Sequence, residues 1–298
     1  MGTLSESQKG IISVIVGSLF LGSIGIFVRY AGTTIEPMTQ SFARIFLAFV
    51  FITLFNLVKS SGKFDIFTIK SQDIKWFVLN GVVGFSVLAS AFTLSILYTT
   101  ITNTYFLLYT APVFVVIFSY TFLKERVQNH TLIVIAVSFL GLIFLFNPSN
   151  LTTNLTGNLF GLLTGVAFGA YFVVTSFLSK KQYSSPVITF WTQLFGALGL
   201  FPLIFIFDKE VNFMHSLAEW LPVIAAGAVV FIGYALLNLG LKKITATTGS
   251  ILSLFEPLSS IMYSIVFFSE FPANSAWIGA LLILMSIVYL TYQTQKEK

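Results

Sequence analysis

The sequence predicts an all-α integral membrane protein in which ten transmembrane helices form two inverted five-helix repeats. Three observations predict this class. Of the 298 residues, 56% are hydrophobic and only 9% are charged, which is too little charge to cover the surface of a soluble domain. Apolar stretches of about 20 residues recur along the whole chain. Basic residues gather in alternate connections between these stretches, and features of the first half return in the same order in the second half.

Each apolar stretch is long enough to cross about 30 Å of hydrocarbon as a helix. A helix is the expected form because lipid offers no hydrogen-bond partner for backbone amides, and the stretches are too long and too uniformly apolar for barrel strands. The ten predicted spans cover residues 10–30, 37–58, 75–97, 100–123, 130–147, 157–179, 186–207, 219–241, 244–268 and 275–293.

The distribution of basic residues predicts the orientation of these spans, with the N- and C-termini in the cytoplasm. Of the 16 basic residues, 13 then lie on the inner side, Arg29 and Lys209 lie on the outer side, and Arg44 falls inside a span. The net charge of +5 therefore indicates contact with anionic lipid and needs no nucleic-acid partner. We expect a multi-pass protein of the plasma membrane, the inner membrane in a bacterium. The inner residues are Lys9, Lys59, Lys63, Lys70, Lys75, Lys124, Arg126, Lys180, Lys181, Lys242, Lys243, Lys296 and Lys298.

Several classes of function are disfavoured by the residues that are missing. The chain has no cysteine, and its two histidines, His130 and His215, stand apart in polar connections, so we expect no metal site and no cofactor. No Walker A motif or phosphate-binding glycine loop is visible, which argues against ATP-driven pumping. No predicted span contains Asp, and the only His in one is His130 at its first residue, so an intramembrane enzyme is disfavoured. A receptor or scaffold is disfavoured because no connection reaches about 20 residues.

The two halves, residues 1–150 and 151–298, share features in a common order. Five spans in each half would make the second half enter the membrane upside down, an arrangement typical of secondary transporters that work by alternating access. The offset between matching residues drifts only from 149 to 144 to 145. The matches are Pro37 with Pro186, Phe42 with Trp191, Arg44 with Gln193, Trp76 with Trp220, Pro112 with Pro257, and Glu125 with Glu270.

Four stretches resemble the drug/metabolite transporter superfamily, in particular its ten-helix EamA-type members. In each half a proline is followed 13 residues later by a glutamate, as in the family's repeated signature, although Lys124 and Ser269 stand where the family usually has glycine before that glutamate. The resemblance covers nearly the whole chain and implies a transporter of a small organic metabolite. It favours export of an amino acid or related solute; an uptake carrier, or an exchanger for another metabolite or drug, is the alternative. The stretches are GSIGIFVRY (22–30), PMTQSFARIFLA (37–48), LLYTAPVFVVIFSYTFLKERV (107–127) and SLFEPLSSIMYSIVFFSE (253–270).

Glu256 and Arg44 are the two charged residues predicted well away from the ends of their spans. A charge at the centre of a spanning helix costs about 2.5–3.5 kcal/mol, so each needs a reason to be there. Glu256 could exchange a proton or bind a cationic part of the substrate, or it could be protonated or hydrogen-bonded to a neighbouring helix. Both residues lie about 10–12 Å below the outer surface at 1.5 Å per residue, so we expect them to approach each other, directly or through water or substrate. The alternative for Arg44 is a side chain that reaches outward to water or loop carbonyls.

Polar and aromatic side chains at helical spacing predict the walls of a cavity between the halves. Interhelical hydrogen bonds would explain the amides equally well. Pro112 and Pro257 are the predicted hinges, because proline removes a backbone donor and crowds the preceding turn. We expect a small-molecule substrate and surrounding lipid as partners; proton coupling and the oligomeric state stay open. The predicted wall residues are Tyr105, Tyr109, Trp191, Gln193, Tyr234 and Asn238.

Overall fold

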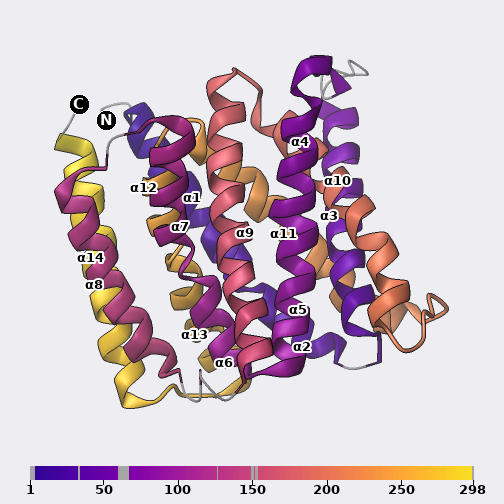
Figure 1. Cartoon of the computed structure of the whole chain (residues 1–298). Coiled ribbons are helices and arrows are strands. Elements are labelled where there is room, and N and C mark those ends of the chain that lie inside the picture. The colour runs from indigo at the N-terminus through magenta and orange to yellow at the C-terminus, as the bar shows by residue number, and fades with distance from the viewer. Residues whose placement is uncertain are drawn as a thin grey trace.

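The computed structural model describes residues 4–32, 34–59, 67–125, 127–148, 151 and 154–296. Within these ranges the regular elements are helices, and ten helical segments are long and apolar enough to cross a membrane, which confirms the predicted class. The first helix begins and the last helix ends at the same end of the bundle (Figure 1), as an even number of crossings requires. The inner residues Lys63, Arg126 and Lys298 lie outside the described residues.

The ten segments are built from single helices or from two or three consecutive ones. The first five are α1 (Glu6–Gly22) with α2 (Ile24–Ala31), α3 (Pro37–Lys59), α4 (Ile74–Gly81) with the π-helix η3 (Val82–Val87) and α5 (Leu88–Tyr98), α6 (Ile101–Leu108) with α7 (Ala111–Phe118) and the π-helix η4 (Ser119–Leu123), and α8 (Asn129–Phe146). The second five are α9 (Leu155–Lys180), α10 (Ser185–Phe207), α11 (Leu217–Leu241), α12 (Ala246–Leu252) with α13 (Phe255–Phe268), and α14 (Asn274–Lys296).

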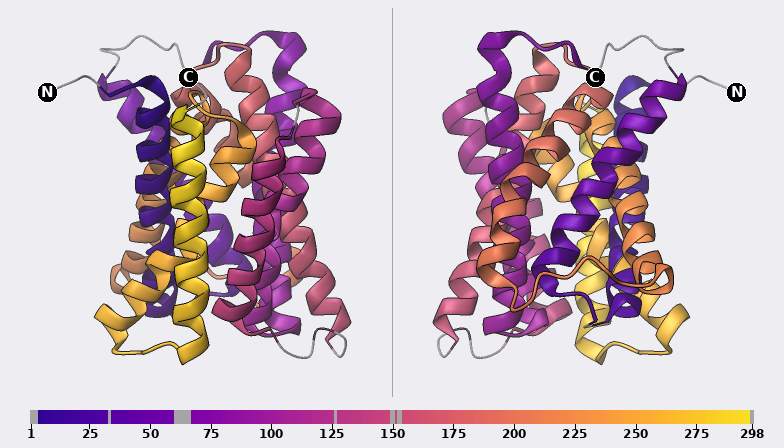
Figure 2. Two further views of the ribbon diagram at one scale, coloured as in Figure 1. Left: turned by 90° about the vertical axis from the view of Figure 1, so that its left-hand side faces the viewer. Right: turned by 90° about the vertical axis from the view of Figure 1, so that its right-hand side faces the viewer.

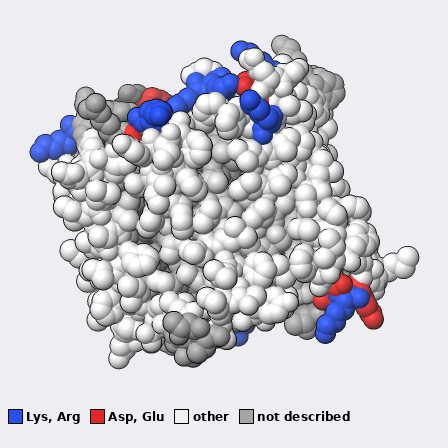
Figure 3. Space-filling model, in the orientation of Figure 1, with Lys and Arg blue, Asp and Glu red and all other residues white. Residues whose placement is uncertain are grey.

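The surface has the distribution of charge that a membrane demands. On the face in Figure 3, Lys, Arg, Asp and Glu gather at the two ends and leave a broad uncharged band between them. Large apolar side chains are exposed on this band's helices, among them Val266 at 73% and Ile206 at 66%. In water such a surface would be unstable, whereas in lipid it is the expected outer face of the bundle.

The helices of the two halves interlock. Helix α1 packs against α11 and α13, while its counterpart five spans later, α9, packs against α5 and α7. Equivalent helices of the two halves also pack together, α3 with α10 and α8 with α14 (Figures 1 and 2). The first span of each half is therefore held by the third and fourth spans of the other half, as a pseudo-two-fold arrangement would produce.

Glycines permit the closest of these contacts. A β-carbon on Gly17 of α1 would lie 2.8 Å from the Gly233 carbonyl oxygen of α11, and one on Gly279 of α14 would lie 2.4 Å from the Gly141 carbonyl oxygen of α8. A methyl group fits at neither distance, so these backbones can approach only where both positions lack side chains.

The fourth and ninth spans are interrupted at matching positions. Helix α6 ends before Tyr109 and Thr110, and α12 ends before Ser253 and Leu254. Each break precedes one of the predicted hinge prolines by two or three residues, because proline disturbs the turn before it. Pro112 lies in the first turn of α7, where its missing N–H is not needed.

The same two spans end in the same tight turn. Lys124 and Ser269, which precede the paired glutamates, have φ values of 57° and 56°. This left-handed conformation is the one glycine adopts without strain, so the turn forms even though this chain lacks glycine there. The backbone N–H of Glu125 then donates to the Ser119 carbonyl, and that of Glu270 donates to the Ser264 carbonyl.

A carboxylate from the second half begins a helix of the first half. Asp208, which follows α10, accepts hydrogen bonds from the backbone N–H groups of Met38 and Thr39 at 3.0 and 2.7 Å, and from the Thr39 hydroxyl at 2.7 Å. These N–H groups belong to the first turn of α3 and have no partner within the helix. Asp208 therefore caps α3 and ties its start to the end of α10.

Candidate functional site

The breaks of the two interrupted spans meet in the middle of the bundle. Glu256 is in the first turn of α13, directly after one break, and Tyr109 is at the other break. The Tyr109 hydroxyl, whose residue is only 1% exposed, interacts with the Glu256 carboxylate without making a hydrogen bond of standard geometry. Helices α7 and α12 are also in contact. The structure thus brings the predicted acid of the second half against the predicted wall of the first half.

Arg44 faces the same region from α3. Tyr105 on α6 and Tyr234 on α11 each interact electrostatically with both the Arg44 guanidinium and the Glu256 carboxylate. All four side chains are partly exposed. The acid and the base are therefore close to the same two tyrosines.

The expected direct pairing of Arg44 with Glu256 is not formed. Both side chains are described by the structure, and no salt bridge joins them. The Arg44 guanidinium donates to the Ser41 hydroxyl at 3.1 Å, and Ser41 is hydrogen-bonded to Thr93 at 3.0 Å. Glu256 has the Tyr109 hydroxyl as its polar neighbour among the described side chains. Arg44 and Glu256 therefore do not neutralise each other.

Asn238, another predicted wall residue, is fully engaged in bonds between helices. Its side-chain oxygen accepts from the Tyr171 hydroxyl of α9, and its amide donates to the Thr189 hydroxyl of α10 at 2.9 Å. Asn238 is 1% exposed, so interhelical hydrogen bonding explains it. Tyr171 was not among the predicted residues, and the glycine-rich sequence around it gave no sign of a polar partner.

The other two predicted wall residues lie on α10. Trp191 packs among aromatic rings, with its centroid 5.5 Å from that of Phe190 and 5.6 Å from that of Phe195. Gln193 is 0% exposed, and neither of its side-chain polar atoms has a hydrogen-bond partner. A buried amide without partners is costly.

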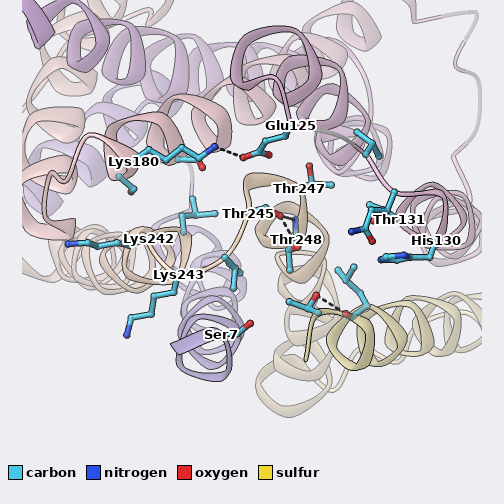
Figure 4. Close-up of a pocket in the computed structure, with 18 of the residues that line it drawn as sticks. Ser7, Glu125, His130, Thr131, Lys180, Lys242, Lys243, Thr245, Thr247 and Thr248 are labelled. Carbon is cyan, nitrogen blue, oxygen red and sulfur yellow. Dashed lines mark hydrogen bonds and ion pairs between the residues drawn. The ribbon is translucent and has the colours of Figure 1, made fainter. Parts of the chain in front are cut away.

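A vestibule of about 720 Å³ opens where α9, α11 and α12 meet the ends of their neighbours. Figure 4 shows Thr245, Thr247 and Thr248, at the start of α12, with the lysines of the α9 and α11 ends on one side and His130 and Thr131 on the other. Helix α12 leads from this vestibule to the break before Glu256. Sequence reasoning missed it, because its lining comes from segments far apart in the chain. Its lining includes Ser7, Glu125, Gln128, His130, Thr131, Lys180, Gln182, Lys242 and Lys243.

The paired glutamates form equivalent salt bridges at the two ends of the bundle. Glu125, after the fourth span, pairs with Lys180 of α9 at 2.7 Å (Figure 4), and Glu270, after the ninth span, pairs with Arg29 of α2 at 2.7 Å. Each bridge joins one half to the first span of the other half. The Arg29 guanidinium, together with the Ser264 hydroxyl, lowers the pKa of the Glu270 carboxyl below its ordinary value.

No metal site is built from the described residues, since three His, Asp or Glu side chains nowhere gather in a metal-binding geometry there. The polar centre instead consists of one acid, one base and tyrosine hydroxyls, with a vestibule leading toward it from one end. Ten membrane-spanning helices around such a centre define a polytopic membrane transporter.

The chain belongs to the EamA-like transporter family, whose sequence model matches residues 8–147 and again residues 155–292. It is similar to an uncharacterized transporter of Archaeoglobus fulgidus, with 26% identity over 94% of this chain and 96% of the relative. It is also similar to the uncharacterized inner membrane transporter YicL of Salmonella typhimurium, with 24% identity over 99% of both chains. The family and these relatives point to a transporter rather than an enzyme.

Two further similarities bear on fold and function. The pseudopaline exporter CntI of Pseudomonas aeruginosa is 22% identical over 95% of this chain and 96% of its own length. A solved crystal structure superposes with a TM-score of 0.79 at 16% identity, covering 96% of this chain and 98% of the other. At that identity the superposition supports the fold alone.

Proposed function

We propose that this protein is a secondary transporter that moves a small organic metabolite, an amino acid or related solute, by alternating access between halves 1–150 and 151–298. Export is the favoured direction, and the exporter among its relatives supports it. Uptake or exchange of another metabolite or drug is the alternative. The proposed location is the plasma membrane, which would be the inner membrane of a bacterium, as the name of one relative suggests.

The observation that carries this proposal is the meeting of two interrupted helices at Tyr109 and Glu256. Transporters with inverted repeats typically build their substrate sites from discontinuous helices near the middle of the membrane. The breaks before Pro112 and Pro257 give each half a point at which a helix can bend. Because the halves interlock in a pseudo-two-fold pattern, bending in one half has a counterpart in the other, and two arrangements of similar energy follow.

Proton coupling is part of the proposal and centres on Glu256. A carboxylic acid in a site that opens to each side in turn can take up a proton on one side and release it on the other. Arg44, Tyr105, Tyr109 and Tyr234 would complete the substrate site around it. Asn238, Trp191 and Gln193 would act less directly, by holding α10 and α11 in place.

Transport by the purified protein in proteoliposomes tests the function. A panel of labelled metabolites is offered with and without a pH gradient, and we expect saturable movement of at least one amino-acid-like solute that responds to the gradient. Glu256→Gln should abolish the response, whereas Glu210→Gln, which changes an exposed carboxylate, should preserve it. An unchanged pH response in Glu256→Gln would remove the proton site, and a panel in which no solute moves would reject the transporter proposal.

Alternating access can be tested separately because the chain has no cysteine. Single cysteines at Thr247 in the vestibule and at Thr99, at the end of α5, would be labelled with membrane-impermeant reagents. A transported solute should change the two labelling rates in opposite directions. If both rates change in the same direction, or neither changes, the two-state mechanism is wrong.

A further inference from the structure

Two short helices hold equivalent places in the repeat but are packed differently. Helix α12 begins the ninth span at the end of the bundle that holds the termini, and α6 begins the fourth span at the opposite end (Figure 1). Helix α12 packs against α7, α9 and α1, and all seven of its residues are buried. Helix α6 packs against α9, α5 and α8, and it makes no comparable contact with α13, α1 or α2, the counterparts of α7 and α9. The seal that α12 forms at one end therefore has no equivalent around α6.

The contacts of two glycines show which positions of the halves correspond in space. A β-carbon on Gly22 of α1 would lie 2.7 Å from the carbonyl oxygen of Glu256, and one on Gly169 of α9 would lie 3.2 Å from the carbonyl oxygen of Ala111. Gly22 and Gly169 are 147 positions apart, and Ala111 and Glu256 are 145 positions apart. The first and sixth spans therefore correspond at the first offset, and the fourth and ninth spans at the second.

The same offsets compare the surroundings of α12 with those of α6. They pair Phe172 with Gly25 and Gly249 with Thr104. Phe172 of α9 is 0% exposed, and its ring lies 3.6 Å from the place of a β-carbon on Gly249 of α12. Gly25 of α2 is exposed, and a β-carbon there would meet nothing within 4 Å. The position that receives α12 at one end thus has a counterpart at the other end that faces unfilled space.

The vestibule leaves α12 room to move away from its present contacts. Its volume of about 720 Å³ borders Thr247 and Thr248 of α12, Ser7 of α1 and Thr294 of α14. Ser7 is 2% exposed, and its hydroxyl has no hydrogen-bond partner. Helix α12 also packs less extensively on α1 than α6 packs on α9. A shift of α12 toward α1 would therefore use space in the vestibule and release α7 and α9.

We propose that the present arrangement is open at the end opposite the termini, and that α6 docks on α2 at Gly25 when that end closes. Glycine suits this position because the two backbones must approach each other closely in the closed arrangement. The inference rests on the proposed transport function and specifies how access to its central site is regulated. With the termini in the cytoplasm, as the basic residues predict, the present arrangement faces outward.

The test measures the distance between α6 and α2 in the purified full-length protein in nanodiscs, by double electron–electron resonance. Spin labels are attached to cysteines at Ile101 and Tyr30, which are 59% and 60% exposed, and the chain has no other cysteine. We expect two distance populations, of which the shorter one comes from docked α6. Phe172→Leu, which weakens the contact that holds α12, should raise the ratio of short to long distances by about threefold or more.

Gly25→Trp is the decisive variant. Its indole ring fits the unfilled space in the present arrangement but blocks α6, so it should remove the shorter population, alone or with Phe172→Leu, without lowering the melting temperature. Leu281→Trp on α14, at a side chain that is 58% exposed, adds the same ring elsewhere and should leave the distances unchanged. The proposal is overturned if Gly25→Trp leaves the distribution as it was, or if it lowers the melting temperature clearly more than Leu281→Trp does. This comparison holds even if Phe172→Leu does not fold.

Failure of this inference can be told apart from failure of the transport proposal, because the distance measurement needs no solute. If Gly25→Trp carries a solute across proteoliposomes at the rate of the unaltered protein, the docking of α6 is wrong and the transporter stands. If Gly25→Trp removes the shorter population but the unaltered protein moves no solute of the panel, the docking stands and the transport function is wrong.

Discussion

Gly22 is the position where a single methyl group should disturb the central site most directly. It ends α1 and touches the first turn of α13, which carries Glu256. A β-carbon at Gly22 would lie 2.0 Å from the Ser259 hydroxyl oxygen and 2.7 Å from the Glu256 carbonyl oxygen. The hydroxyl can rotate away, but the carbonyl is backbone. To move from 2.7 Å to the 3.4 Å of an ordinary contact, the start of α13 must retreat from α1 by about 0.7 Å.

The expected size of the effect follows from a matched comparison with Gly25, one turn later. A β-carbon at Gly25 meets nothing within 4 Å, so Gly25→Ala should bring only the gain in helix propensity, up to about 1 kcal/mol. Gly22→Ala carries the same gain and an overpacking cost of about 1–3 kcal/mol. The two variants should therefore differ in free energy of unfolding by about 1–3 kcal/mol, which corresponds to a difference of several degrees in melting temperature.

Two assays test this prediction. The first is thermal unfolding in detergent, and the second is binding of a metabolite that the proteoliposome panel shows to be transported. Gly22→Ala should melt below Gly25→Ala and should bind more weakly, since Glu256 moves with its turn. Adding Ser259→Ala to Gly22→Ala should restore only part of the loss, because the backbone contact remains. Equal melting temperatures for the two alanine variants, or complete rescue by Ser259→Ala, would refute the argument from backbone contact.

Three further predictions concern the ends of helices. Asp208→Ala should lower the melting temperature through the loss of about 1–2 kcal/mol of capping at Thr39, and Asp208→Asn should retain most of it; equal losses would contradict capping. Ser269→Gly should raise the melting temperature, because φ is 56° there, and a fall would show that the turn carries no strain. The lowered pKa of Glu270 means that its bridge to Arg29 stabilises the protein above the ordinary pKa of 4.5 and is lost as pH falls below that value; a Glu270→Gln variant should show a shallower acid-induced drop in melting temperature, and an identical drop would oppose this.

The spans could be predicted from sequence because lipid leaves the backbone so few options. An apolar run of about 20 residues must be a helix, so counting runs gives the ten segments. The breaks in the fourth and ninth spans were harder to locate, since proline identifies the disturbed helix but the disturbance falls on the turn before it. Pro112 and Pro257 are the predicted hinges, and the helices that precede them end at Leu108 and Leu252.

The site was partly predictable for a related reason. A charged residue inside a span, such as Glu256 or Arg44, is expected to face the bundle interior. The same expectation led to the tyrosines at helical spacing as predicted wall residues. Which helices touch each other is not encoded in such local patterns. Spacing alone therefore suggested that Asn238 lines the cavity, whereas its side chain is hydrogen-bonded to Tyr171 and Thr189 on two other helices. The vestibule escaped prediction for the same reason, since its lining comes from segments far apart in the chain.

The two halves repeat the scaffold but not the chemistry. The repeat position of Glu256 in the first half is held by Ala111, and that of Arg44 in the second half is held by Gln193. Helix breaks, left-handed turns and salt bridges occur twice, so in the proposed mechanism they would serve both arrangements of the protein. The acid and the base occur once each, and they come from opposite halves. In the proposed alternating-access mechanism the repeated scaffold would supply two arrangements, and a ligand in contact with both the acid and the base would touch both halves, so that its binding would favour one arrangement.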